Sequence, residues 1–248
     1  MHSSIHWGSF VAMAFVSACA GTPGAAPHDM SVQGHEHAAE AADASAAQHG
    51  GHYDPESAVT RTKCPGPQRN TDTDAGNVAC WTSEVNPTKE HLAEAERMRK
   101  AAADHRAASQ ALRDAEAAAC TGLSESDRDT SPLQRPGDIV AVQELRAPSG
   151  SYRAAGLTRI SGAKVTIRAV PGLTKEYLQR LVSCHLARNS SMGHAMAEMA
   201  TCPLGVKGAT ATVEGEGGAF VVRVTSEEDA SATEIVKRAR TLAPAPVQ

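Results

Sequence analysis

Methionine and histidine side chains gather in one short stretch of the C-terminal third of the chain. Met192, His194, Met196 and Met199 all lie between Cys184 and Cys202. Thioether sulfur is a good ligand for Cu(I), and imidazole binds Cu(II), Zn(II) and Ni(II). This spacing predicts a site for copper or a similar metal. The alternative is that the methionines fill gaps in a hydrophobic core, as flexible thioether side chains often do.

A second group of potential metal ligands lies near the N-terminus. Residues 20–57 are rich in Ala, Gly, Pro, Ser and His and lack a periodic pattern of large apolar residues, which predicts a disordered tether. The histidines of this segment that we expect to assist metal capture are His35, His37, His49 and His52. The alternative is a solvated linker that binds no metal.

The cysteines limit how the chain can be cross-linked. If residues 88–119 form one helix, that helix is roughly 48 Å long, and the eight residues from Cys80 to its start reach back only about 27 Å. Cys80 and Cys120 therefore cannot form a disulfide. We predict the pairs Cys64–Cys80 and Cys184–Cys202, with Cys120 unpaired.

The segment from Thr88 to Ala119 has the clearest helical pattern, because it is rich in Ala, Glu, Lys and Arg and contains neither Gly nor Pro. Its apolar face is narrow. His91, Met98 and His105 recur every seven residues and so share one stripe, which favours packing against a partner helix. They are about 10 Å apart along the helix, too far to share one metal ion.

The C-terminal segment predicts a compact module with the order β-α-β-β-α. Residues 164–170 alternate apolar and polar side chains, as a half-buried strand does. Residues 174–188 show helical spacing, residues 209–213 and 219–224 form a hairpin around a glycine-rich turn, and residues 226–242 form a last helix. The fold class expected is α+β: a disordered His-rich tether, a long Ala-rich helix and this module.

The chain begins with a leader pattern. Met1 to Cys19 contain no Asp, Glu, Lys or Arg, and the apolar run within them is too short to span a bilayer. Val16-Ser17-Ala18-Cys19 resembles the lipobox of bacterial lipoprotein precursors. The resemblance covers the leader only. It implies acylation of Cys19, and Ala20 after the cysteine implies sorting to the outer membrane, facing the periplasm. The alternative is ordinary cleavage, which gives a soluble periplasmic protein.

These observations leave two functional hypotheses. With 24 Lys+Arg against 28 Asp+Glu the chain has no strong field for nucleic acid, and no motif of a known enzyme class is present. The first hypothesis is a lipoprotein that binds or buffers copper or a similar metal. The second is a structural or adaptor lipoprotein that docks another envelope protein and has no metal site.

The expected organisation follows from these assignments. The segments are a leader at 1–19, the tether at 20–57, an irregular Cys-containing region at 58–87, the long helix at 88–122, a connecting segment at 123–160, the module at 161–243 and a tail at 244–248.

Overall fold

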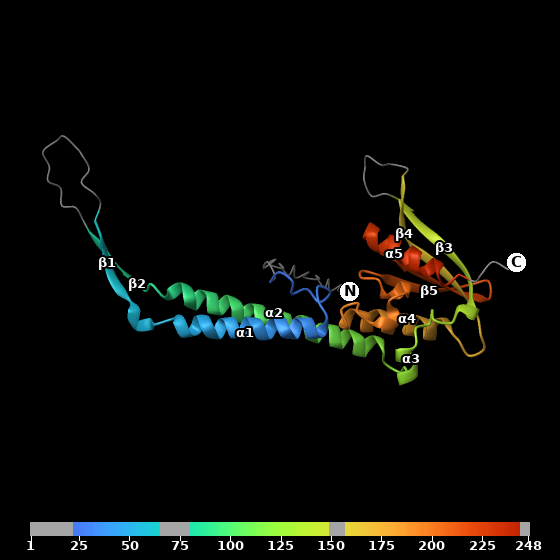
Figure 1. The fold of residues 1–248 in the computed structure, drawn as a ribbon, viewed down its shortest axis with the longest axis horizontal. Helices are drawn as coiled ribbons and strands as arrows, with labels where there is room; N and C mark the ends of the chain where they lie inside the picture. The colour runs from blue at the N-terminus through green and yellow to red at the C-terminus, as the bar shows by residue number, and fades with distance from the viewer. Residues whose placement is uncertain (1–21, 65–79, 149–156, 244–248) are drawn as a thin grey trace, which may run out of the picture.

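The computed structural model describes residues 22–64, 80–148 and 157–243. It contains a long two-helix arm and a body of mixed helices and strands, and a two-stranded ribbon lies at the end of the arm farthest from the body (Figure 1). The mixed helix and strand content confirms the α+β class. The expected leader, Cys19 and the tail at 244–248 lie outside the described residues.

The arm consists of α1 (Val32–His52) and α2 (Lys89–Ala119), which run antiparallel along each other. The prediction of a long helix from residue 88 to 119 is confirmed. The prediction of a disordered tether over 20–57 is wrong for residues 32–52. These residues are rich in alanine, which has the highest helix propensity, and Ser31 caps the helix by accepting a hydrogen bond from the Gly34 amide at 3.0 Å.

Small side chains hold the two helices together. Ala39 and Ala46 on α1, and Ala95 and Ala102 on α2, are at most 3% exposed. Each pair is seven residues apart, which is the repeat of a coiled-coil seam. Alanine leaves room for a close approach of two backbones, so small side chains contribute much of the packing between the helices. The stripe of His91, Met98 and His105 therefore faces α1, and the expected partner helix is part of the same chain.

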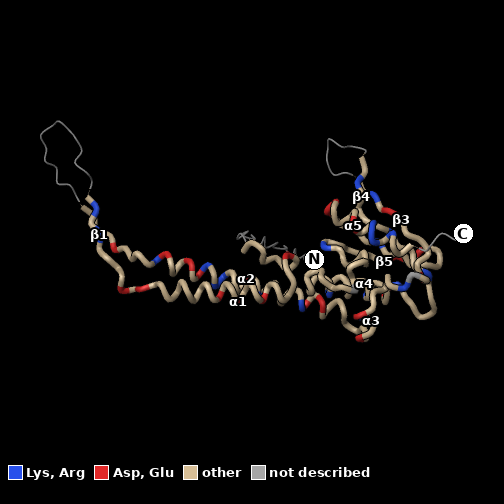
Figure 2. The backbone as a smooth tube through the Cα atoms, viewed as in Figure 1, with Lys and Arg blue, Asp and Glu red and all other residues tan. Residues whose placement is uncertain are grey.

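Ion pairs across the helices add to this packing. Arg106 contacts Asp43, and Arg113 contacts Glu36, each from α2 to α1. Both pairs are half exposed, so each contributes at most about 1 kcal/mol. Figure 2 shows acidic and basic residues interspersed along α2 rather than separated by sign.

The ribbon at the end of the arm is formed by β1 (Val59–Lys63) and β2 (Trp81–Val85), which pair antiparallel. A disulfide joins Cys64 to Cys80 directly beyond the paired strands, with Cα atoms 4.3 Å apart, so this predicted pair is confirmed. An isolated two-stranded ribbon is marginally stable in water, and the cross-link closes it at its far end. We call β1 and β2 the tip ribbon.

The body comprises the described residues from 123 to 243. Its sheet has the order β3-β4-β6-β5, and every neighbouring pair of strands is antiparallel. The strands are β3 (Ile139–Pro148), β4 (Thr158–Arg168), β5 (Thr210–Glu216) and β6 (Ala219–Thr225). The helices are α3 (Glu125–Asp129), α4 (Lys175–Ser191) and α5 (Asp229–Arg240).

One core joins the sheet to two of these helices. Val165 faces Val222 across β4 and β6, and both pack with Val182 of α4 and Ile235 of α5. The opposite sheet face carries polar side chains such as Lys164 and Arg223, which are neighbours in the same register. The body is therefore a two-layer structure with helices on one side of the sheet.

The segment from 123 to 160 is more structured than expected. Ser124 caps α3 by accepting a hydrogen bond from the Asp127 amide at 3.2 Å. Residues 139–148, however, form the edge strand β3, which pairs with β4. The apolar run at the start of β3 gives way to charged residues, and this weakens the alternation by which a strand is recognised.

A second disulfide joins the arm to the body. Cys120, at the end of α2, is bonded to Cys184 in the middle of α4, and Cys202 is a buried free thiol. The predicted pair Cys184–Cys202 and the prediction of an unpaired Cys120 are therefore wrong. The end of α2 packs against the face of α4 that carries Cys184 and Leu181, whereas Cys202 packs in the sheet core with Leu204 and Met199.

The residues that precede α1 lie along α2. The Thr22 hydroxyl donates a hydrogen bond of 2.5 Å to Asp104, which also binds Lys100. The pKa of Asp104 is lowered, chiefly by the hydrogen bond from Lys100 and then by that from Thr22. The described chain thus begins beside the middle of α2 rather than at the end of a free tether.

The disulfide between arm and body gives a first prediction. In the chain-entropy model a closed loop with a sequence separation of 64 residues stabilises the folded state by about 4 kcal/mol. We expect Cys120→Ser to lower the free energy of unfolding by about this amount in urea titrations.

The free thiol of Cys202 can be tested by labelling with maleimide followed by peptide mapping. Cys202 should react only after the protein is denatured, because burial raises the pKa of its thiol. A peptide in which Cys184 is linked to Cys202 would contradict the assignment.

Candidate functional site: arm histidines, tip ribbon and body pocket

The four predicted ligands in the loop after α4 do not converge. Met196 and Met199 are 3% and 1% exposed and pack in the body core, whereas Met192 is 48% exposed. The thioethers of Met196 and Met199 are therefore surrounded by apolar side chains. The alternative interpretation, in which these methionines fill gaps in the core, agrees with this packing.

His194 occupies a tight turn in the same loop. Its backbone has a φ of 62°, the left-handed region that few side chains adopt. The ring atom Nδ1 lies 2.5 Å from Asn189 Nδ2, so Asn189 donates to it and its lone pair is engaged. Desolvation lowers the pKa of His194, and nearby Lys207 lowers it further. The histidine is thus held by a polar contact with the last turn of α4, and its lowered pKa favours the neutral form.

The histidines of α1 meet histidines of α2 in pairs. His35 Nδ1 lies 3.1 Å from His105 Nδ1, and His49 Nδ1 lies 3.2 Å from His91 Nδ1. His37, in contrast, is exposed beside Glu40 on α1. We call His35–His105 the inner pair and His49–His91 the outer pair. The two pairs are fourteen residues apart on each helix, so they occupy equivalent layers of the arm.

The inner pair is a buried hydrogen bond with a defined direction. His35 is fully buried and His105 is 7% exposed. His35 Nε2 lies 3.3 Å from the carbonyl oxygen of Pro27, to which it donates its N–H. In a neutral imidazole the other nitrogen is then an acceptor, so His105 donates from Nδ1 to His35 Nδ1. The pair is satisfied internally and serves the packing of the arm.

The outer pair lies near the tip ribbon and is more open. His49 and His91 are partly exposed and His52 is exposed. The ring of His52 lies 5.3 Å from that of His91, and the His49 and His91 rings are 5.5 Å apart, measured between centroids. The His91 ring therefore lies close to both His49 and His52, where α1 ends and α2 begins. Across residues 22–64, 80–148 and 157–243, no set of three or more His, Cys, Asp or Glu side chains is already assembled as a metal site.

The tip ribbon is almost entirely exposed. All five residues of β1 and four of the five in β2 are exposed. Trp81 is 52% exposed and Val59 is 47% exposed. Residues opposite each other in an antiparallel pair share a face, so Lys63 lies with Trp81, and Arg61 lies with Ser83. One face of the ribbon thus combines apolar and basic side chains, and the other carries Thr60, Thr62, Thr82 and Glu84.

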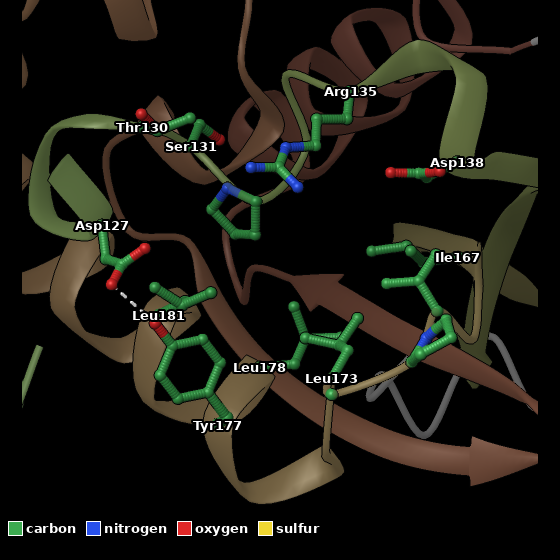
Figure 3. Close-up of a pocket in the computed structure, with 14 residues that line it drawn as sticks. Asp127, Thr130, Ser131, Arg135, Asp138, Ile167, Leu173, Tyr177, Leu178 and Leu181 are labelled. Atoms are coloured by element: carbon green, nitrogen blue, oxygen red, sulfur yellow. Dashed lines mark hydrogen bonds between the residues drawn. The ribbon is translucent and has the colours of Figure 1, made fainter.

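The body contains a cavity of about 250 Å³ between α4 and the segment that follows α3. Figure 3 shows Leu173, Leu178 and Leu181 on the apolar side of the cavity, and Arg135 and Asp138 across from them. Tyr177 donates a hydrogen bond of 2.6 Å from its hydroxyl to Asp127.

The Asp127–Tyr177 contact orients the cavity wall but does not activate a nucleophile. The hydrogen bond from Ser124 and then that from Tyr177 lower the pKa of Asp127. The same hydrogen bond to Asp127 raises the pKa of Tyr177, so the phenol holds its proton more firmly. Neither Asp127 nor Tyr177 is singled out by the sequence as a functional residue. Their contact joins residues fifty positions apart, and no local sequence pattern predicts it.

Comparisons of this chain with protein-family models, with curated proteins and with solved structures find no match. In the part of the chain that the structure describes, no helix has both the length and the apolar character needed to cross a membrane.

The buried His185 gives a prediction on pH. Its side chain is 1% exposed, and its Nε2 donates a hydrogen bond of 2.7 Å to the Thr130 carbonyl. Burial is the main cause that lowers the pKa of His185 below its ordinary value of 6.5. As the pH falls below about 6.5, the unfolded chain gains a proton before the folded chain does, so the folded state loses stability.

We therefore expect the free energy of unfolding to fall between pH 7 and pH 5 with a contribution from His185 of at most about 1.4 kcal/mol per pH unit. His185→Gln keeps an N–H donor and does not titrate, so its stability should depend less on pH than that of the unchanged protein in parallel urea titrations. Equal pH dependence of the two proteins would show that His185 is not held neutral.

Proposed function

We propose that this protein is an exported envelope lipoprotein that acts as a structural adaptor. In this proposal the lipid on Cys19 holds the chain at the outer membrane, facing the periplasm. The arm presents the tip ribbon to another envelope protein. The single observation that carries the proposal is the tip ribbon itself, which is exposed on nearly every residue and lies at the end of the arm opposite the body.

The low intrinsic stability of this ribbon supports a role in binding, because the ribbon contributes little to the stability of the fold. A two-stranded ribbon without a covering layer gains little from burial and is stabilised here by the Cys64–Cys80 disulfide. Its strands pair only with each other among the described residues, so each keeps one edge of backbone donors and acceptors open to a partner. Exposed strand edges are templates for strand addition by another chain.

The side chains of the ribbon suggest the chemistry of the partner. Trp81 is largely exposed, and exposed tryptophans are frequent anchors of protein interfaces. Arg61 and Lys63 share the face of Trp81. A matching protein surface would offer an apolar pocket for the indole ring and carboxylates around it.

Two features support the proposed export. Val16-Ser17-Ala18-Cys19 has the form of a lipobox, and the two disulfides are of the kind that form and persist in oxidising compartments.

The metal-buffering hypothesis receives less support. Two of its four predicted ligands in the body, Met196 and Met199, lie in the core, and His194 is bound to Asn189. Of the predicted ligands in residues 20–57, His35 is buried in the inner pair and His37 lies apart from the other histidines. The adaptor function is therefore the one proposed.

The lipid anchor can be tested by labelling. Cells that express the full chain are grown with a radioactive or clickable fatty acid, and the protein is isolated from the membrane fraction. We expect the label on the unchanged protein and none on Cys19→Ala, which should move to the soluble fraction if it is still exported. Labelling of Cys19→Ala to the same extent would contradict the assignment.

The docking role can be tested with cross-linkers placed on opposite faces of the tip ribbon. A photoreactive residue at Ser83 lies on the Trp81 face, and one at Thr82 lies on the other face, so the two variants are matched controls. We expect a discrete cross-linked envelope protein from position 83 in intact cells, and a much weaker product from position 82. Adding Trp81→Ala to the Ser83 variant should remove most of the product.

Two results would overturn the docking role. One is the absence of any specific product from both positions at normal protein levels. The other is a product from position 83 that is unaffected by Trp81→Ala. Circular dichroism of the purified variants verifies that the arm remains helical.

A further inference from the structure

The outer pair and its neighbour His52 carry an inference that is independent of the docking role. Imidazole is a preferred ligand of Zn(II), Cu(II) and Ni(II). In such complexes the metal–nitrogen distance is about 2.0–2.1 Å, and two ligands at a tetrahedral angle are then about 3.3 Å apart. His49 Nδ1 and His91 Nδ1 lie 3.2 Å apart, as hydrogen-bonded partners, and this distance is close to the separation of two nitrogens bound to one ion.

The ring positions agree with the same geometry. Two imidazoles bound to one tetrahedral ion have centroids about 5 Å apart when the metal–nitrogen distance is added to the ring radius. The centroids of His49 and His91 are 5.5 Å apart, and those of His52 and His91 are 5.3 Å apart. His52 is one turn along α1 from His49, on the exposed side of the pair, so a change of its rotamer can turn it toward the pair.

The inner pair has a similar nitrogen separation but a different environment. His35 is fully buried, and its second nitrogen donates to Pro27. A metal ion at the inner pair would have to enter the buried alanine seam, and among the described residues no third imidazole contacts this pair. The outer pair is partly exposed and has His52 beside it. The chain thus contains one pair suited to packing and one suited to an ion.

We propose that His49 and His91 chelate a divalent transition-metal ion, with His52 drawn in as a third ligand and water completing the shell. The Nδ1 atoms of His49 and His91 are already close enough to bind one ion. Binding of the ion would then favour the rotamer of His52 that brings its ring to the same ion. Bound there, the ion would link α1 to α2 at the end of the arm next to the tip ribbon. It would hold the two strands of the ribbon at a fixed separation where they leave the helices.

The test uses the full folded protein after removal of metals by a chelator. Zn(II) is titrated by calorimetry, and Cu(II) is added for electron paramagnetic resonance, which detects nitrogen ligands. We expect one ion per chain at the site, nitrogen couplings in the copper spectrum, and slower hydrogen exchange at residues 49–52 and 88–91 with Zn(II). His49→Gln and His91→Gln should lose this binding, and His52→Gln should weaken it.

Matched variants separate this site from other histidines. His105→Gln changes the inner pair on the same helix, and His194→Gln changes the loop histidine of the body, and both should retain the binding. Binding by His91→Gln equal to that of the unchanged protein would overturn the proposal. The proposal would also be overturned if Zn(II) bound to the unchanged protein without slowing hydrogen exchange at residues 49–52 and 88–91, because the ion would then be bound elsewhere. Neither result bears on cross-linking from the tip ribbon, so this proposal and the docking role fail separately.

Discussion

The close antiparallel packing of α1 on α2 is the interaction on which the rest of the molecule depends. The seam consists of alanines and paired histidines, with Ala39, Ala46, Ala95 and Ala102 nearly inaccessible to water. Each alanine buries little apolar area, so the stability of the seam depends on its length and on the regular spacing of its buried residues. Without it, α1 would have no partner, the tip ribbon would lose its base, and the outer histidines would not meet.

The junction with the body makes this arm part of one molecule. Cys120 is bonded to Cys184, and Glu116 accepts a hydrogen bond of 2.5 Å from Ser191 beside a longer ion pair with Arg188. These contacts fix the last turns of α2 along α4. Because α4 is in turn embedded in the sheet core through Leu178 and Val182, a force applied at the tip ribbon would reach the body through α2 and α4.

Much of the fold follows from local sequence patterns. The bounds of α2 were predictable because a long run of strong helix formers is bordered by Thr88 and Gly122. The alternating pattern of residues 164–170 marks only the second half of β4, which begins at Thr158 and ends at Arg168, and the glycine-rich turn after residue 214 lies between β5 and β6. Cys64–Cys80 was predictable because the long helix leaves Cys80 few partners within reach.

What the sequence did not reveal depends on contacts between distant segments. Low hydrophobicity suggested a disordered tether, but His35, Ala42 and His49 have the same seven-residue spacing as His91, Met98 and His105. That shared period was the available signal for α1. The Cys120–Cys184 bond and the Asp127–Tyr177 contact bring together residues 64 and 50 positions apart. Spacing along the chain gives no measure of such proximity, and so the nearest cysteine was wrongly taken as the partner of Cys184.

The hydrogen bond between Thr22 and Asp104 determines how the proposed anchor would orient the molecule. Two residues, Ala20 and Gly21, lie between Cys19 and Thr22, so the Cα atoms of Cys19 and Thr22 are at most about 10 Å apart when this stretch is fully extended. Acyl chains on Cys19 would therefore keep the midpoint of α2 within a short distance of the lipid headgroups. An anchor of this reach would hold the middle of α2, rather than an end of the arm, close to the membrane surface, and this would limit how far the tip ribbon can extend away from the bilayer.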